Sequence, residues 1–148
     1  MANFVEVIGG RKSQHHYAYS IVDFCIGKLM PRMQTLDITI KFTRLKDAMG
    51  YCLSQDKRTF EIEVDSRACL KEQLRTIAHE MVHVKQYARG ELGSELSTWY
   101  NKSYNTDKVD YWERPWEIEA HGWELGLFIN WTIREELNHK TWTTIPLA

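Results

Sequence analysis

The sequence has little cysteine and no long apolar run. Its three cysteines, Cys25, Cys52 and Cys69, are far apart and form no CxxC pair, which excludes a zinc ribbon and a disulfide framework. No stretch approaches the roughly 18 apolar residues of a membrane span, and residues 1–10 hold no basic segment followed by an apolar one. We therefore expect a soluble, cytoplasmic protein with no membrane partner, whose cysteines are reduced and buried.

The chain also lacks an excess of either charge. It has 19 Lys and Arg residues against 20 Asp and Glu residues, for a net charge of −1. This balance gives no electrostatic reason to expect a nucleic-acid partner. The sequence has no repeats and no proline-rich linker, and 148 residues fit a single core, so we expect one domain over residues 1–148.

The hydrophobic pattern of the first half predicts one helix and three strands. Apolar residues recur every three or four positions over residues 14–29, which predicts a helix that Pro31 ends. Residues 37–42 and 59–65 alternate between apolar and polar side chains. Together with residues 50–54 they predict a small three-stranded, mainly antiparallel sheet, with residues 59–65 at or near an edge.

Two further helices are expected in the second half. Asp65 or Ser66 is expected to cap a helix that stops at Gly90. Residues 91–114 show no period and predict an ordered but irregular loop, and Pro115 suits the first turn of a last long helix over residues 116–138. This order of elements predicts an α+β fold with its helices on one side of the sheet.

The sequence HEMVH within the predicted second helix indicates metal chemistry. His79 and His83 are four residues apart, so their rings project from one helix face and can share a metal ion. Glu80 is turned by about 100° from His79, where it reaches a metal-bound water without ligating the metal. Zn²⁺ lowers the pKa of such a water toward about 7, and a carboxylate moves its proton. The motif predicts a zinc-dependent peptidase with Glu80 as general base and acid.

A catalytic zinc ion needs a third protein ligand. The metzincin extension requires Gly at position 86 and His at position 89, where this chain has Gln86 and Arg89, so that branch is excluded. The segment EIEAH on the last predicted helix offers Glu117, Glu119 and His121 instead. Glu117 and His121 share a helix face, whereas Glu119 lies about 200° around the helix from Glu117.

HEMVHVKQY followed by RPWEIEAH resembles the minimal gluzincins, which include SprT-like and small phage or bacterial metallopeptidases. In that family the third ligand is a glutamate on a later helix, in a pattern E-x-x-A-[DN] or E-A-x-x-D. The first pattern gives Glu117 here, with His121 in its last place, and the second gives Glu119. The resemblance favours His79, His83 and Glu117 as zinc ligands, with Glu119 as the alternative. It leaves His121 either to steady a ligand or to replace the glutamate.

The resemblance covers roughly residues 59–127 and implies a zincin-like fold. In the family, the strand before the metal helix pairs with an extended polypeptide substrate. The resemblance implies this role for the strand 59–65, and an ordinary half-buried strand is the alternative. SprT-like relatives that act on DNA-bound proteins usually carry basic or zinc-ribbon additions, which this chain lacks, so phage or bacterial peptidases are the nearer analogy. The alternative is a non-catalytic, zinc-stabilised module in phage assembly or regulation. An intact Glu80 argues against that alternative, since a structural site needs no base.

All six tryptophans lie between Trp99 and Trp142. We interpret them mainly as core packing and only secondarily as walls of a substrate cleft. Tyr104 and Tyr111 are both candidates to stabilise an oxyanion. Gln86, on the face of the two motif histidines, is expected to line the site.

Overall fold

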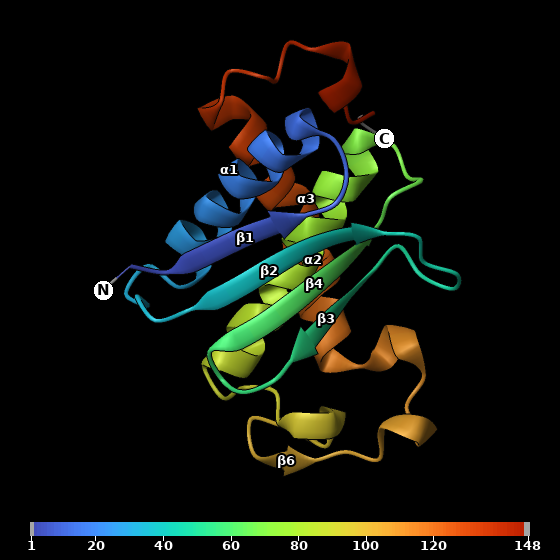
Figure 1. Ribbon diagram of the computed structural model, residues 1–148. Helices are drawn as coiled ribbons and strands as arrows, with labels where there is room; N and C mark the ends of the chain where they lie inside the picture. Colours follow the sequence, from blue (N-terminus) through green and yellow to red (C-terminus); the bar gives the residue numbers. More distant parts are fainter. Residues whose placement is uncertain (1, 147–148) are drawn as a thin grey trace.

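The computed structural model describes residues 2–146, so three residues of the expected domain, Met1, Leu147 and Ala148, lie outside the described part. The longer elements and the short strands and 3₁₀ turns follow one another along the chain (Figure 1). In chain order they are β1 (Phe4–Ile8), α1 (Lys12–Leu29), β2 (Asp37–Thr43), β3 (Gly50–Ser54), β4 (Thr59–Asp65), α2 (Leu70–Ala88), η1 (Ser94–Leu96), β5 (Thr98–Trp99), β6 (Lys102–Ser103), η2 (Thr106–Lys108), η3 (Tyr111–Glu113), α3 (Pro115–Arg134) and η4 (Thr141–Thr143).

Four strands form one mixed sheet in the order β1-β2-β4-β3 (Figure 1). β1 pairs with β2 and β2 with β4 in parallel, and only β3 and β4 are antiparallel. The α+β class is confirmed, but the prediction of a three-stranded, mainly antiparallel sheet is wrong. β1 has only five residues and was missed, and α1 is the crossover that parallel pairing of β1 with β2 requires.

β4 lies inside the sheet and not at its edge. Both of its sides are paired, by β2 and by β3. Its polar residues Glu61 and Glu63 belong to the outer face of the sheet, and polar side chains on one face do not make a strand an edge strand. The expectation that residues 59–65 pair with a substrate is therefore wrong, because β4 has no free backbone side. β3 is the edge strand next to α2.

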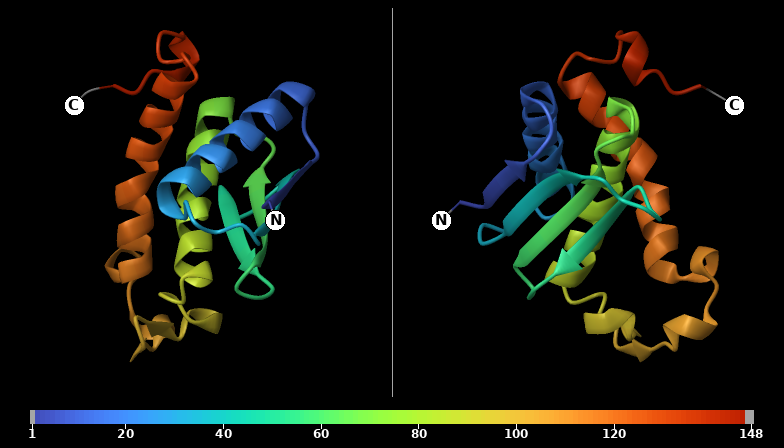
Figure 2. Two further views of the ribbon diagram at one scale, coloured as in Figure 1. Left: turned by 90° about the vertical axis from the view of Figure 1, so that its left-hand side faces the viewer. Right: turned by 45° about the vertical axis from the view of Figure 1, so that its right-hand side comes forward.

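The three long helices lie on one face of the sheet, as expected (Figure 2). α1 and α2 pack against the strands, and α3 packs on α2 on the side away from the sheet. Fully buried side chains such as Ile40, Ile62, Leu74 and Ile77 fill the space between the sheet and α2. Each contributes about 1.5–3 kcal/mol by leaving water. In the described part of the chain, no helix has the length and apolar character needed to cross a membrane.

The start of α2 differs from the prediction. The helix begins at Leu70 after Cys69, so neither Asp65 nor Ser66 caps it. Asp65 ends β4, and its carboxylate accepts the backbone N–H groups of Leu45 and Arg67. Aspartate is common at helix caps because its carboxylate accepts backbone N–H groups. Asp65 makes hydrogen bonds of that kind here, but they stabilise a turn and not the start of α2.

The two other helices match their predicted positions more closely. α1 starts two residues early, at Lys12, where the Gln14 side chain accepts the N–H of Arg11. α3 starts at Pro115 and ends at Arg134, four residues before the predicted end. Its end follows from Glu136, which has a left-handed backbone with φ of 58°.

Residues 91–114 are mostly irregular, as expected, except for the small β5–β6 hairpin. The segment contains four non-glycine residues with φ between 49° and 66°, a region that L-residues seldom adopt. They are Glu95, Leu96, Tyr100 and Asn101.

Candidate metal centre

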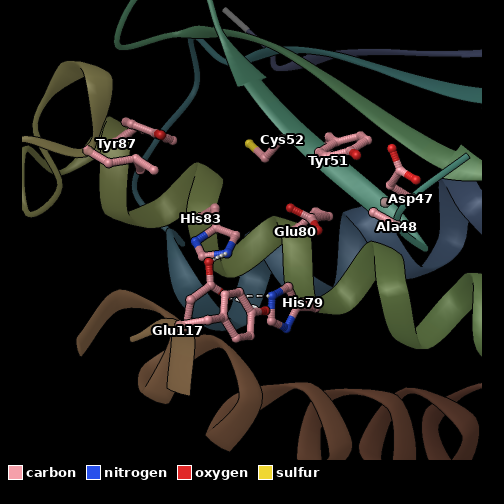
Figure 3. Close-up of a pocket in the computed structure, with 12 residues that line it drawn as sticks. Asp47, Ala48, Tyr51, Cys52, His79, Glu80, His83, Tyr87 and Glu117 are labelled. Carbon is pink, nitrogen blue, oxygen red and sulfur yellow. Dashed lines mark hydrogen bonds and ion pairs between the residues drawn. The ribbon is translucent and has the colours of Figure 1, made fainter. Parts of the chain in front are cut away.

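His79, Glu117 and His83 converge between α2 and the first turn of α3 (Figure 3). Nε2 of His79 lies 3.1 Å from Glu117 Oε1, and Nε2 of His83 lies 3.2 Å from Glu117 Oε2. One potential ligand atom from each residue lies within 4.8 Å of the others. Trp116 and Ala120 are fully buried on either side of Glu117 in the sequence, so the packing of α3 fixes the carboxylate opposite the two rings.

The second nitrogen of His79 is held by a residue that sequence analysis missed. His79 Nδ1 lies 3.0 Å from Glu124 Oε1. Because a carboxylate only accepts hydrogen bonds, Nδ1 carries the proton. Glu124 also binds His121 Nδ1 at 2.8 Å and Arg75 Nη2 at 3.4 Å. Its spacing of seven residues from Glu117 places it two turns further along the same face of α3, a signal that the sequence did contain.

The second nitrogen of His83 is held by Gln86, which is buried instead of lining the site as expected. His83 Nδ1 lies 2.7 Å from Gln86 Oε1. The amide is oriented by its other end, since Nε2 donates to Trp116 O at 2.9 Å and to Glu119 Oε1 at 3.0 Å. The amide oxygen therefore faces His83 and fixes the proton on Nδ1. Both motif histidines are oriented with Nε2 toward Glu117.

The two alternative ligands point elsewhere. Glu119 turns away from the histidines and binds Lys85 Nζ at 2.6 Å. His121 packs with its ring centroid 4.4 Å from that of His79. It belongs to a separate group of potential ligands with His79 and Glu124. The geometry thus brings Glu117, and not Glu119, to the motif histidines.

The charges of this cluster are strongly coupled. Burial alone lowers the pKa of His79, but hydrogen bonds to Glu117 and Glu124 outweigh it and raise the pKa to about 10. The pKa of His83 is also raised, because the hydrogen bond to Glu117 and the charge of Glu80 outweigh burial. Burial raises the pKa of Glu117, yet its hydrogen bonds to both rings lower it well below its ordinary value.

These shifts describe a site that favours positive charge. Three carboxylates, those of Glu80, Glu117 and Glu124, surround two imidazoles in a largely buried space. A proton and a metal ion compete for each Nε2 lone pair, and a divalent ion also neutralises the carboxylates. Two imidazole nitrogens and one carboxylate, each steadied from behind, match the ligand set of a catalytic zinc ion.

Glu80 lies on the side of α2 that faces β3 (Figure 3). It is buried, and burial raises the pKa of its carboxyl group. A Cβ on Gly50 of β3 would clash with Thr76 Cγ2, would lie 2.9 Å from the backbone oxygen of Glu63 and would come within 3.6 Å of Glu80 Oε1. Only glycine allows the edge strand to approach the motif helix this closely.

A cleft of three adjoining hollows runs along β3. The central hollow, of about 430 Å³, contains His79, Glu80, His83 and Glu117. The amino-side hollow, of about 330 Å³, reaches toward the start of α2 and includes Glu72 and Arg75. The loop-side hollow, of about 610 Å³, lies between β3 and residues 90–101. The central hollow shares residues with both neighbours: Ala48, Gly50, His79, Glu80 and Tyr111 on one side, Cys52 and Tyr87 on the other.

The free backbone side of β3 faces this cleft. Asp65 N–H donates to Met49 O, and Gln55 N–H donates to Thr59 O. Antiparallel residues alternate between pairs that exchange hydrogen bonds and pairs that do not. The odd-numbered residues of β3 therefore bond to β4, and the even-numbered ones turn their amide and carbonyl groups outward. These are Gly50, Cys52 and Ser54, and each lines the cleft.

Of the two tyrosines that are candidates to stabilise an oxyanion, one lines the cleft and the other packs against α3. Tyr111, on η3, lines both the central and the amino-side hollow, and its hydroxyl donates to Glu117 Oε1 at 3.0 Å. Tyr104 packs edge-on against Trp116, with ring centroids 5.6 Å apart. The tryptophans divide similarly, because Trp116 is fully buried whereas Trp112 is 66% exposed and lines the amino-side hollow.

The cysteines are all free, and only Cys25 is buried. The expectation that all three are buried is wrong for Cys52, which lines the cleft, and for Cys69, which is exposed just before α2. The sequence pattern does not show that Cys52 is only half-buried, because this depends on the place of β3 at the edge of the sheet.

Comparisons of the chain with models of protein families, with curated proteins and with solved structures gave no significant match. The resemblance to gluzincins therefore rests on the motifs of α2 and α3 alone. The case for function rests on the geometry of these residues.

Proposed function

We propose that this protein is a zinc-dependent metallopeptidase of the gluzincin type. His79, His83 and Glu117 hold the zinc ion, and Glu80 is the general base and acid. The observation that carries the proposal is the convergence of three ligand atoms inside an open cleft, with the far nitrogen of each ring already held by a neighbouring side chain. A bound zinc ion supplies a Lewis acid and lowers the pKa of water toward about 7.

The residues of the chain divide the remaining work. Glu80, beneath Gly50, takes the proton of the attacking water and passes it to the leaving amine. The Tyr111 hydroxyl, which donates to Glu117 Oε1 in the free site, changes partner and donates to the oxyanion that develops on the scissile carbonyl. Glu124 and Gln86 keep the two rings oriented throughout.

The proposed substrate is a polypeptide in extended conformation. The outward backbone groups of Gly50, Cys52 and Ser54 give it a strand to pair with, so β3 replaces β4 in this role. We place the reaction in the cytoplasm of a bacterium, or of the host cell for a phage-encoded chain. Three free cysteines are consistent with a reducing compartment.

A purely structural zinc site is the competing proposal. Structural sites are closed by a fourth protein ligand. Here the ligand atoms line a hollow of about 430 Å³, and Glu80 points into it. Both features favour the enzyme.

Metal content tests the ligand set. Wild type is expected to hold about one zinc ion per chain, as a mononuclear site does, and Glu117→Ala to lose it. Glu119→Ala and His121→Ala are matched controls that should keep it. Mass spectrometry of metal after dialysis measures all four proteins. Absence of zinc from the wild type after zinc is supplied would overturn the proposal.

Cleavage tests the chemistry. Glu80→Gln should bind zinc as the wild type does, yet cleave unfolded casein about 10²–10⁴-fold more slowly, the usual contribution of a general base. Gel electrophoresis of the digest measures the rate. Equal cleavage by both proteins, or none by the wild type, would favour the structural site.

A further inference from the structure

One short part of the cleft has no side chain that is charged at neutral pH. The amino-side hollow carries Glu72, Arg75, His121 and Glu124, and the loop-side hollow carries Asp56, Lys57 and Glu95. Between them, the end of the central hollow beyond His83 is lined by Cys52, Tyr87 and Leu96, none of them charged at neutral pH. We call this last part the apolar end.

Three separate elements form the apolar end. Tyr87 lies one turn after His83 on α2, Cys52 lies on β3, and Leu96 ends η1. Both Tyr87 and Cys52 are half-buried, and their loss of hydration raises the pKa of Tyr87 to about 12 and raises the pKa of the Cys52 thiol as well. Both shifts are those of groups in a poorly hydrated environment.

Leu96 is held in place by an unusual backbone. Its φ is 55°, and that of Glu95 is 59°, a conformation that is rare for a branched apolar residue. The Thr106 hydroxyl donates to the carbonyl of Leu96, and Tyr104 N–H donates to Ser97 O at 2.9 Å. Strained residues of this kind gather at functional sites, where the surrounding contacts enforce them. Here they direct a leucine to the wall of the cleft.

We infer that the apolar end binds an aliphatic or aromatic side chain of the substrate residue beside the scissile bond, and that Leu96 determines this specificity. The inference rests on the proposed function. An apolar side chain loses contact with water there, whereas a charged one loses its hydration and finds no group of opposite charge among Cys52, Tyr87 and Leu96.

Short peptides that differ at one position test the inference. The probes are acetyl-Gly-Ala-Xaa-Ala-Gly amides with Leu, Phe, Asp or Lys at Xaa. Wild type should cleave the Leu and Phe peptides at a bond next to Xaa, with kcat/KM at least about tenfold above the Asp and Lys peptides. The zinc-loaded Glu80→Gln variant should bind the four peptides in the same order, as measured by isothermal titration calorimetry.

Two variants of one residue separate specificity from folding. Leu96→Asp should reduce the preference for Leu and Phe about tenfold or more at unchanged zinc content. Leu96→Gly accepts the positive φ without strain, so it should fold at least as stably and still lose the preference. Leu125→Asp, at an exposed position of α3 that lines no part of the cleft, is the matched control and should behave as wild type.

The outcomes distinguish this inference from the proposed function. Equal binding of the four peptides, no binding of any, or an unchanged preference in Leu96→Gly would overturn the inference. Selective binding by Glu80→Gln without cleavage by the wild type would support the apolar end and contradict the peptidase. Cleavage without selectivity would do the reverse.

Discussion

Among residues 2–146, two groups of side chains have the spacing of a metal site, and they face opposite nitrogens of His79. The first donor group is His79, His83 and Glu117, and the second is His79, His121 and Glu124; each falls within the same 4.8 Å limit. The two groups differ in the hydrogen bonds that their side chains already make. In the second group, Glu124 already binds Arg75 and both rings. In the first, Glu124 and Gln86 support the rings from behind.

Convergence of side chains alone therefore does not define a metal site. A ligand must keep a lone pair after its supporting hydrogen bonds are counted. By that count the second group is the support of the first and not its rival. Four experiments test this distinction between ligand and support.

Removal of a ligand from the first donor group should have the largest effect. His83→Ala should weaken zinc binding by more than the roughly 100-fold that loss of a supporting residue causes. Competition with a fluorescent zinc chelator measures the dissociation constant. An affinity within tenfold of wild type would show that the first donor group is not the site.

Loss of a side chain that holds a ligand in place should have an intermediate effect on zinc affinity. Glu124→Gln is expected to weaken zinc binding about 10–100-fold, since an amide holds His79 Nδ1 less firmly than a carboxylate does. Glu72→Gln, at the other carboxylate near Arg75, is the control and should leave the affinity unchanged. If Glu124→Gln abolished zinc binding as fully as His83→Ala, Glu124 would itself be a ligand.

The pH dependence of the stability of the metal-free protein tests the hydrogen bonds of the same cluster. The pKa of His79 rises from 6.5 to about 10 on folding, so its contribution to stability is complete below pH 6.5 and is lost as the pH rises toward 10. The pKa of Glu117 falls below 4.5, so its contribution is present above pH 4.5 and is lost in more acid solution. We expect these contributions to overlap between pH 4.5 and 6.5.

Urea denaturation with excess chelator measures the free energy of unfolding at each pH. The wild-type value should fall between pH 6.5 and 10 relative to that of His79→Gln, which lacks the titrating ring. Parallel curves for the two proteins would contradict the coupling of His79 to Glu117 and Glu124.

The smallest effect is expected for His121→Ala. In the described part of the chain, His121 packs against the ring of His79, but its hydrogen bonds go to Glu124 and Tyr111 and not to His83 or Glu117. Zinc affinity should therefore change by less than the roughly tenfold lower bound for a supporting residue. A larger loss, measured with the same chelator, would return His121 to the ligand set.

Local patterns in the sequence predicted the parts of the fold and site that depend on few residues. The positions of α1, α2 and α3 follow from their apolar period, although the first residue of α2 and the last of α3 do not. The i, i+4 spacing is enough to put His79 and His83 on one face. Family resemblance then favoured Glu117 over Glu119, and the packing of α3 brings that residue to the rings.

Long-range pairing was beyond the reach of the sequence. Whether a five-residue strand exists at β1, and which neighbour β4 takes on each side, depends on contacts between distant segments. The same limit applies to Gln86 and Glu124. Their types and spacing were visible, but their hydrogen bonds depend on how α3 is placed against α2.

The position of β3 at the sheet edge has a consequence for which proteins the proposed peptidase can attack. A cleft with a strand edge on one wall and helices and loop on the other admits a single stretch of backbone whose own hydrogen bonds are already broken. Folded proteins satisfy their backbone internally, so they become substrates only while a segment is locally open. The turnover of such substrates then depends on the population of that open state as well as on the residue beside the cut.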